Sequence, residues 1–346
     1  MSDESGRRLE PGLDAIAKAL YAVSRSGGTV AILPHVRADG DAVGTSLAVA
    51  SAVARLGGRP DVRVEEPLDW TLSRLPGAGL IGIGNPEGPE RGAEPDAAVM
   101  LDCGDVSRLA GRAALYEAAR VKIVLDHHIS SHPSEGLRLI DPASAAVGEI
   151  AYHLIRRMET LSGSELLSHD EANCLMGAIL TDTGGFRFTN TTRETFRIAS
   201  ALMQYDVDIS ALSFDLLESM TLAKYRLIGL ANEHAAFHRD GTVAILCVSR
   251  QMLLDTGADE NDTNGLANML RAVDSVRVAL VLKEGENGIV RVNIRCKEGF
   301  DAAGFASAFG GGGHARAAGF NLEGTDLESA AAMLAILAGK RLDGGT

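Results

Sequence analysis

Carboxylate and imidazole side chains recur in this sequence directly after short apolar runs. The members of this set are His35, Asp39, Asp41, Asp102, Asp126, His127 and His128. Carboxylates and imidazoles together form a ligand set that divalent cations take in proteins. Each segment alone has a plainer explanation, because an aspartate can cap a helix and a histidine pair can lie in solvent. Their recurrence after successive apolar runs favours a shared metal site.

Two further features extend this set. Gly40 lies between Asp39 and Asp41, and its conformational freedom predicts a tight turn that lets both carboxylates face one point. Asp182 ends an apolar segment with helical spacing. The helix dipole disfavours an acidic residue near a helix C-terminus, so Asp182 indicates a cation nearby.

A glycine run at Gly310–Gly313 precedes His314 and Arg316. Backbone N–H groups in such a run can bind a phosphate, whereas the alternative is a flexible linker. The helix-forming pair Ala317-Ala318 directly after it argues against a linker. Arg295, on the preceding predicted strand, is a second candidate for phosphate recognition, because a guanidinium can bind two oxygens at once.

The apolar runs themselves predict buried strands at 29–34, 97–101 and 121–125. Segments with helical spacing occur at about 13–25, 42–56, 147–158, 169–180 and 193–203. Alternating strands and helices predict an α/β fold, with a parallel sheet and helices on both faces. Ligands of such sheets bind at the carboxyl ends of the strands, so residues distant in the sequence are expected to meet there.

The pattern changes after a helical segment at about 210–230. Strand-like alternation follows within 233–248 and 276–295, and a last helix is predicted at about 327–337. We therefore expect a first domain over 1–212, a helical linker over 213–230 and a smaller α/β domain over 231–346. The candidate residues lie on both sides of the linker, so the site is expected in the cleft between the domains.

Composition excludes several classes of protein. The chain has 346 residues and a formal net charge of −13, which opposes binding to long DNA or RNA. No apolar stretch approaches the length of a membrane span, and the polar N-terminus lacks the apolar core of a signal peptide. The four cysteines are widely separated, which indicates reduced thiols and a cytoplasmic protein.

Four segments, HVRADGDAVG, LDCGD, LDHHISS and TDTGGF, occur in this order and together resemble the motifs of the DHH phosphoesterase family. The segment GFASAFGGGGHARAAGF resembles the DHH-associated C-terminal domain. The resemblance extends from about residue 29 to residue 320. Chain length and domain pairing are similar to the NrnA-like group, which implies activity as an oligoribonuclease and as a phosphatase on 3′-phosphoadenosine 5′-phosphate (pAp).

The resemblance implies two divalent metal ions. Mn²⁺ is the expected metal, because oxygen-rich ligation favours Mn²⁺ over Zn²⁺, and Mg²⁺, Co²⁺ and Zn²⁺ are the alternatives. The metal ligands that it implies are His35, Asp39, Asp41, Asp102, His127 and Asp182, with Asp102 bridging the ions. In catalysis, His128 would face the substrate phosphate and Asp126 would support the histidines. The substrate-binding residues that it implies are Arg295, Gly311, Gly312, Gly313, His314 and Arg316, with Arg108 at the edge of the site.

The partners expected are a short RNA or small nucleotide substrate and, as a homodimer, a second copy of the chain. No membrane or long duplex is expected. The sequence departs from the family pattern at Ala38, Ser131, Ala145–Val147 and Cys296, which leaves substrate preference open. The alternatives are a phosphodiesterase for cyclic dinucleotides, pApA or pGpG, and a non-catalytic nucleotide-binding regulatory protein.

Overall fold

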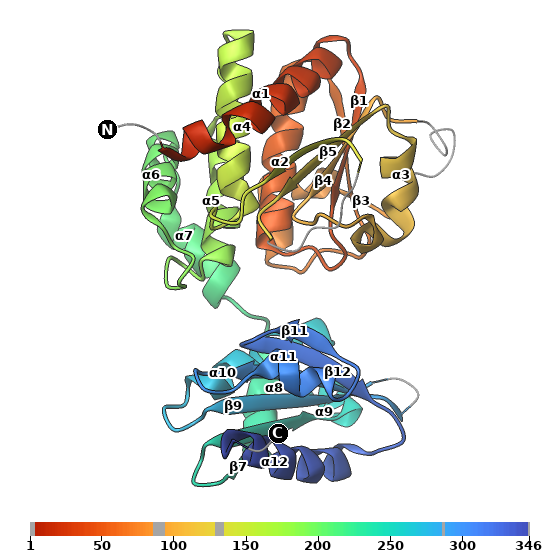
Figure 1. Ribbon diagram of the computed structural model, residues 1–346, viewed down its shortest axis with the longest axis vertical. Helices are drawn as coiled ribbons and strands as arrows, with labels where there is room; N and C mark the ends of the chain where they lie inside the picture. The colour runs from red at the N-terminus through yellow and green to blue at the C-terminus, as the bar shows by residue number, and fades with distance from the viewer. Residues whose placement is uncertain (1–3, 86–93, 129–134, 286–287, 345–346) are drawn as a thin grey trace. The chain divides into compact units, whose positions relative to one another are not determined.

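The computed structural model describes residues 4–85, 94–128, 135–285 and 288–344. The chain divides into two compact units, Met1–Ser219 and Met220–Thr346, and each unit is considered by itself (Figure 1). The predicted linker over 213–230 covers the end of the first unit and the first helix of the second. Ser131 lies outside the described residues.

The first unit is built on a parallel sheet with the strand order β3-β2-β1-β4-β5-β6. The strands are β1 (Thr29–Pro34), β2 (Arg59–Val64), β3 (Gly82–Ile83), β4 (Ala97–Leu101), β5 (Val121–Asp126) and β6 (Leu137–Ile140). The three predicted strands are the central ones. They are mostly apolar because helices cover both faces of the sheet, and Lys122 near the start of β5 is the one charged residue within the predicted runs.

One face of this sheet packs against the helices α1 (Glu4–Arg25), α2 (Gly40–Arg55), α4 (Val147–Ser162) and α5 (His169–Asp182). The other face packs against α3 (Ala113–Ala118) and the irregular helical segment Val106–Arg112 (Figure 1). The helices α6 (Arg193–Leu202) and α7 (Ile209–Ser213) complete the unit. The predicted fold class, a parallel sheet with helices on both faces, is confirmed.

The predicted continuous helix over 210–230 is wrong. After α7, one π-helical turn covers Phe214–Glu218, and the chain is extended at Ser219 before α8 (Leu222–Glu233) begins. Thr221 caps this new helix by accepting a hydrogen bond from the backbone N–H of Lys224. Leu227 and Ala231 of α8 are buried in the core of the second unit, so α8 belongs to that unit.

The second unit has a mixed sheet with the strand order β11-β12-β10-β9-β8-β7. The strands are β7 (Ala236–His238), β8 (Val243–Val248), β9 (Val278–Glu284), β10 (Val290–Cys296), β11 (Gly312–His314) and β12 (Ala317–Leu322). The helices α8 and α10 (Leu266–Ala272) pack on one face, and α11 (Ala302–Ser307) and α12 (Leu327–Leu342) pack on the other. α9 (Arg250–Thr256) lies beside α8.

The prediction of a helix-forming segment at Ala317-Ala318 is wrong, because both residues lie in β12, which pairs with β10 and β11. The glycine run is likewise not a free loop, since Gly312 and Gly313 form part of β11. Pairing within the sheet overrides the helix propensity of alanine here. No helix within the described parts of the chain is long and apolar enough to cross a membrane.

Candidate metal centre

The ionisable residues of the first unit lie where the central strands end. His35 follows β1, Asp102 follows β4, and His127 and His128 follow Asp126, the last residue of β5. Because these three strands are adjacent and parallel, their carboxyl ends meet at one edge of the sheet. These residues, which are far apart in the sequence, therefore lie together in the structure.

Two neighbouring helices bring the remaining carboxylates. Asp39 precedes α2 and Asp41 lies in its first turn, while Asp182 is the last residue of α5. Asp39 does cap α2, because its Oδ1 accepts a hydrogen bond from the N–H of Ala42 at 3.1 Å. Its other oxygen, Oδ2, lies 3.9 Å from His35 Nε2, so the cap and the cluster use different oxygens of one carboxylate.

Asp102 lies at the centre of the cluster. Its Oδ2 is 3.1 Å from His35 Nε2 and its Oδ1 is 3.4 Å from His127 Nε2. His127 Nε2 is also 3.2 Å from Asp182 Oδ2 and 4.0 Å from Asp41 Oδ2. The structure therefore brings all six predicted metal ligands together, although their roles as ligands stay a prediction.

The backbone at Asp102 has a left-handed conformation, with φ of +57°. Such a conformation is uncommon for residues other than glycine, and aspartate and asparagine tolerate it best. The N–H of Asp102 donates to the carbonyl of Leu125 on the neighbouring strand. This turn directs a buried carboxylate back across the strand ends.

Backbone carbonyls orient the two imidazoles that face Asp102. His35 Nδ1 lies 2.7 Å from the carbonyl of Val36, and His127 Nδ1 lies 3.2 Å from the carbonyl of Ser144. A ring nitrogen that donates to a carbonyl leaves the other nitrogen, here Nε2, available as a metal ligand. Both Nε2 atoms point toward the carboxylates.

Asp41 is fully buried and is held by the start of α4. Its two oxygens accept hydrogen bonds from the N–H groups of Val147 and Gly148, at 2.6 and 2.9 Å, and Oδ1 also accepts one from the hydroxyl of Thr45. The N-terminal end of a helix favours an adjacent negative charge. Position 147 is one of those that depart from the family pattern. The departure keeps this contact, because the donor is the backbone N–H of Val147.

The protonation equilibria of the cluster reveal an excess of negative charge. Burial raises the pKa of Asp182 to about 7, and the neighbouring Asp39 carboxylate adds to the rise. Burial and the carboxylates of Asp182 and Asp102 raise the pKa of Asp41 well above its ordinary value. Burial lowers the pKa of His127, but its hydrogen bond to Asp102 and the surrounding carboxylates outweigh burial and bring it to about 10.

The pKa of Asp102 is shifted in the opposite direction. Burial raises its pKa, but the hydrogen bonds from His127 and His35 outweigh this and hold the pKa well below its ordinary value. Its Oδ1 is nevertheless buried without a hydrogen bond of acceptable geometry to any described residue. A cation would satisfy this oxygen and offset the surplus charge, so the residues present fit a metal site.

Three groups of side chains could each hold an ion, with ligand atoms within 4.8 Å of one another. They are His35–Asp39–Asp102, Asp41–His127–Asp182 and Asp102–His127–His128. The first two correspond to the two predicted sites. Oxygen and imidazole nitrogen donors without thiolates favour hard or borderline divalent cations.

Asp126 contacts only one of the two histidines that it was predicted to support. Its Oδ1 lies 2.8 Å from Nδ1 of His128 and accepts a hydrogen bond from the N–H of the same residue. His127 is oriented by Ser144 instead. His128 is the more exposed of the two, with 37% of its side chain accessible, and its Nε2 is the nitrogen left for a substrate oxygen.

Gly40 has a different role from the predicted one. It is the first residue of α2 and has no positive φ. A Cβ atom there would lie less than 3.0 Å from the side chain of Thr181 on α5. Gly40 therefore allows α2 and α5 to approach closely beside Asp41 and Asp182, rather than providing a turn.

Asn190 was missed by the sequence analysis. Its side-chain amide donates to the carbonyl of Asp182 at 3.1 Å and to the carbonyl of Ala145 at 3.0 Å. It thus ties the end of α5 to the segment that holds His127 and Asp41. The local sequence Thr-Asn-Thr-Thr is typical of a polar loop and gives no sign of this role.

Arg108 is exposed on the segment Val106–Arg112, and its carbonyl accepts a hydrogen bond from the N–H of Val36. Its guanidinium lies close enough to Cys103 to moderate the rise that burial causes in the pKa of that thiol, to about 12. Arg108 therefore lies near Cys103, the residue after Asp102, and its place at the edge of the site stays a prediction. All four cysteines are free.

The other predicted substrate-binding residues lie in the second unit. Arg295 of β10 pairs with Ala317 of β12, which pairs in turn with His314 of β11. Directly opposed residues share a face, so Arg295 and His314 lie in one row on the same face of the sheet. Cys296 faces the opposite way and is buried with α11 and α12.

The three predicted substrate-binding glycines, Gly311, Gly312 and Gly313, differ in their surroundings. A Cβ atom at Gly311 or Gly313 would collide with the backbone of β12, while Gly312 faces open space. Arg316 is exposed in the turn between the strands, 4.0 Å from Glu298. The glycine run is therefore part of a tight hairpin and not a free loop, while its binding of a phosphate stays a prediction. Arg295 and His314 lie in one row across the strands beside it.

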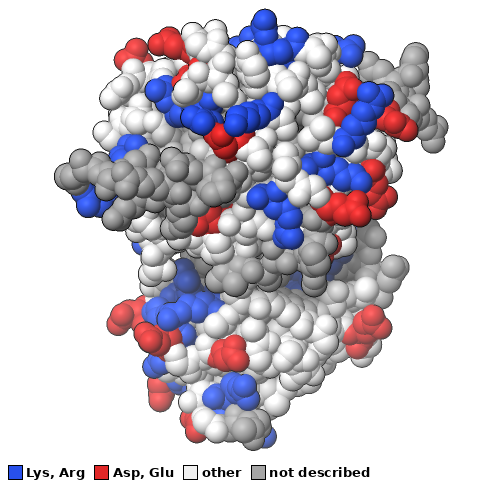
Figure 2. Space-filling model, turned by 45° about the horizontal axis from the view of Figure 1, so that its top comes forward, with Lys and Arg blue, Asp and Glu red and all other residues white. Residues whose placement is uncertain are grey.

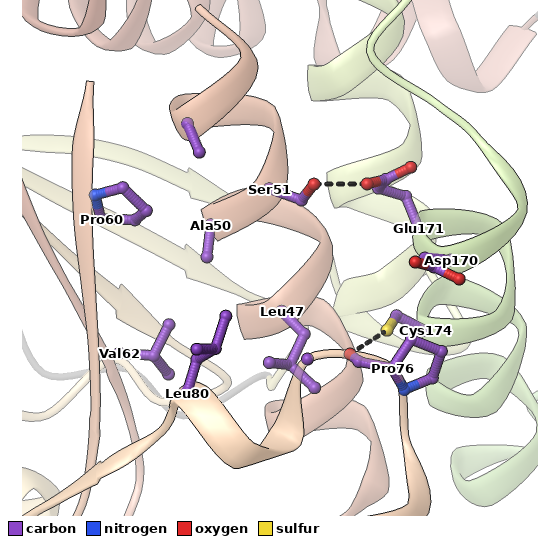
Figure 3. A pocket seen from close by; sticks show the side chains of 12 residues that line it. Leu47, Ala50, Ser51, Pro60, Val62, Pro76, Leu80, Asp170, Glu171 and Cys174 are labelled. Carbon is purple, nitrogen blue, oxygen red and sulfur yellow. Dashed lines mark hydrogen bonds between the residues drawn. The ribbon is translucent and has the colours of Figure 1, made fainter. Parts of the chain in front are cut away.

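A separate cavity of about 300 Å³ lies in the first unit between α2, α5, β2 and the segment around Gly77 (Figure 3). Leu47, Ala50, Val62 and Leu80 line its apolar part. None of the predicted site residues lines it.

Comparison with known proteins agrees with this architecture. Residues 29–179 match the N-terminal domain of the DHH family, and residues 240–339 match the DHHA1 domain. The chain is 34% identical over 316 residues to the bifunctional oligoribonuclease and PAP phosphatase NrnA of Thermus thermophilus. That alignment covers 91% of this chain and 90% of the relative.

Among solved structures, an exopolyphosphatase-related protein from Bacteroides fragilis is similar with a TM-score of 0.82 and 22% identity, over 96% of this chain and 95% of the other. RecJ of Thermus thermophilus in complex with Mn²⁺ is similar with a TM-score of 0.58 and 16% identity, over 96% of this chain and 55% of the other. These likenesses concern the fold. The nearly full-length relation to NrnA, with both domains present in order, shows that the chain belongs to the DHH family of phosphoesterases, in its NrnA-like group.

Proposed function

We propose that the chain is a phosphoesterase that depends on divalent metal ions, hydrolysing short oligoribonucleotides to nucleoside monophosphates and pAp to AMP. The observation that carries the proposal is the convergence of His35, Asp102 and His127 with three further carboxylates at one edge of the sheet. The Thermus thermophilus relative is named for both of these activities.

Two ions are proposed because the cluster contains two groups of three ligands without a shared residue, His35–Asp39–Asp102 and Asp41–His127–Asp182. Mn²⁺ is the proposed metal, since the donors are oxygen and nitrogen and the RecJ structure holds Mn²⁺. When bound, such ions lower the pKa of coordinated water and offset charge on phosphoryl oxygens.

The protein's own part in catalysis is to hold these groups in place. Asp126 fixes the ring of His128 through Nδ1, so Nε2 can contact a phosphoryl or leaving-group oxygen of the substrate. The N–H groups at the start of α4 hold the carboxylate of Asp41 in place where it faces His127. These contacts preorganise the cluster before a substrate arrives.

A short substrate is favoured by the charge of the chain. With a formal net charge of −13, the protein repels long polyanions. On the face shown in Figure 2, acidic and basic side chains are interspersed rather than gathered into a continuous basic surface. Recognition is therefore proposed to rest on a few residues of the second unit, Arg295, His314 and Arg316 among them.

A substrate panel with and without Mn²⁺ tests the proposal. We expect metal-stimulated release of mononucleotides from dinucleotides to five-residue RNAs and of phosphate from pAp, with much lower rates on a long RNA. Preferential turnover of cyclic dinucleotides would instead support a cyclic-dinucleotide phosphodiesterase. Tight nucleotide binding without turnover in any metal would support a regulatory protein.

The role of Asp102 can be tested separately with Asp102→Asn. Asparagine tolerates the left-handed backbone but removes the charge, so we expect metal-stimulated turnover to fall by about a hundredfold or more. Asp206 has the same φ of +57° outside the cluster, which makes Asp206→Asn the matched control. Wild-type rates in Asp102→Asn would refute the metal centre.

Size-exclusion chromatography with light scattering tests the homodimer, which stays a prediction of the sequence, as does the cytoplasmic location.

A further inference from the structure

The face of the second sheet that carries Arg295 and His314 also carries positive charge from a helix. Arg295 is paired across the sheet with Ala279 of β9 as well as with Ala317. Ala279 packs against Leu266, Ala267 and Leu270 of α10. α10 therefore covers the β9 end of the row in which Arg295 and His314 lie.

Arg271 directly follows Leu270 in the last turn of α10. Its charge is close enough to Arg295 that, after burial, it is the next cause of the lowered pKa of that guanidinium. Burial raises the pKa of the Cys296 thiol, the neighbour of Arg295 in β10, and the charge of Arg271 slightly offsets this rise. The packing of α10 against β9 and β10 places Arg271 on the same side of the sheet as Arg295, and the effect of its charge on the pKa of Arg295 agrees with this placement.

Neither guanidinium is neutralised by a carboxylate. Within the described parts of the chain, Arg295 donates only to the carbonyl of its neighbour Ile294, and Arg271 has no ion pair or hydrogen bond. Arg291, four residues earlier on the same strand face, is by contrast paired with Glu260 at 2.6 Å. In so acidic a chain, an arginine of the sheet and an arginine of the helix that covers it, both without a carboxylate partner, indicate an anion-binding site.

The strand beside Arg295, β12, carries small residues on this face. Ala317 and Gly319 of β12 lie on the same face and have small or no side chains, and Gly312 faces open space. His314 lies two strand spacings from Arg295, about 10 Å away. A nucleotide that lies across β12 would reach the two arginines with one end and His314 with the other.

We propose that Arg271 is a further substrate-binding residue that forms, with Arg295, a two-guanidinium site for the terminal phosphomonoester of the substrate. A terminal phosphate carries nearly two negative charges at neutral pH and three acceptor oxygens, whereas an internal diester carries one charge. Two guanidinium groups match the monoester. The site would thus select substrates that end in a phosphate, and this inference rests on the proposed function.

The experiment compares the wild type with Arg271→Gln and Arg291→Gln in two assays. Hydrolysis of pApA, ApAp and ApA with Mn²⁺ measures the preference for a terminal phosphate. Calorimetric titration with pAp in EDTA measures binding without turnover. We expect Arg271→Gln to raise KM for the preferred phosphorylated dinucleotide and Kd for pAp by about tenfold or more, with kcat little changed.

Arg291→Gln should behave as the wild type in both assays, because Arg291 is paired with Glu260 and not with the substrate. Arg271→Lys keeps the charge but not the fork of donors, so its affinity should be intermediate. It also provides a second variant should the glutamine variant unfold. Equal values for Arg271→Gln, Arg291→Gln and the wild type would overturn the inference while leaving the proposed function intact.

A lack of hydrolysis by the wild type, together with weaker pAp binding by Arg271→Gln alone, would refute the proposed function and retain the anion site. A wild type that hydrolyses ApA as efficiently as pApA and ApAp would overturn the preference for a terminal phosphate.

Discussion

Substitution of Gly44 by alanine tests whether the close packing of α2 on α5 positions the metal centre. Gly44 lies inside α2, and a Cβ atom there would come less than 3.0 Å from the carbonyl oxygen of Cys174 on α5. The obstacle is backbone, so no side-chain rotation relieves it. Ordinary contact begins at 3.4 Å, so the two helices must separate by about 1 Å.

Two opposing effects set the size of the stability change. Alanine in a helix interior gains about 0.5–1 kcal/mol over glycine, whereas overpacking a core costs about 1–3 kcal/mol. We expect Gly44→Ala to lower the free energy of unfolding by about 1–2 kcal/mol. For a unit of this size, that corresponds to a Tm lower by about 2–8 °C.

The assay is urea unfolding together with metal titration of turnover. Because Asp41 lies at the start of α2 and Asp182 at the end of α5, the Mn²⁺ concentration for half-maximal rate should rise. Gly229 of α8 is the matched control, since a Cβ atom there would meet nothing within 4 Å. Gly229→Ala should therefore be neutral or stabilising by about 0.5–1 kcal/mol. A Gly44→Ala protein as stable as Gly229→Ala, with unchanged metal dependence, would refute the reasoning.

Two more predictions concern contacts around the cluster. Asn190→Ala removes the amide that links Asp182 to Ala145, so we expect about 10–100-fold weaker Mn²⁺ activation and restored rates at saturating Mn²⁺; a change in kcat alone would contradict a positioning role. Burial raises the pKa of Glu171, but hydrogen bonds from Ser168 and Ser51 and the charge of Arg55 hold it below the ordinary value of 4.5. The carboxylate therefore stabilises the fold above pH 4.5 and loses this effect as the pH falls through its lowered pKa. Glu171→Gln should be about 1–2 kcal/mol less stable than the wild type at pH 7, and this difference should shrink progressively as the pH falls below 4.5, as measured by urea unfolding at each pH; a difference that stays the same at every pH would exclude the charge as its cause.

The central strands and the composition of the cluster could be predicted from the sequence because both depend on residue type along the chain. β1 and β4 coincide with apolar runs that are buried on both faces. β2, with the sequence RPDVRV, was missed because polar residues interrupt its apolar pattern. It lies between β1 and the short outer strand β3.

The supporting contacts could not be predicted, since backbone groups make many of them. The N–H groups of Val147 and Gly148 hold Asp41, and a backbone donor has no signature in residue type. The roles of Gly40 and Gly44, which let α2 approach α5 closely, could not be predicted either. A glycine can serve a turn or a close approach, and only the position of α5 distinguishes the two.

The arrangement of the cluster also couples the metal ions to folding. Its members come from segments between His35 and Asp182, so a fragment that begins after His35 or ends before Asp182 lacks part of the set. Under the proposed function, ions held there would act as cross-links between β1, β4, β5, α2 and α5, and an ion at a hundred times its Kd would add about 2.7 kcal/mol to the stability of the unit. No described residue of the second unit belongs to the cluster. Metal starvation would therefore weaken one half of the chain selectively, and the cell's supply of divalent cations would set its lifetime as well as its activity.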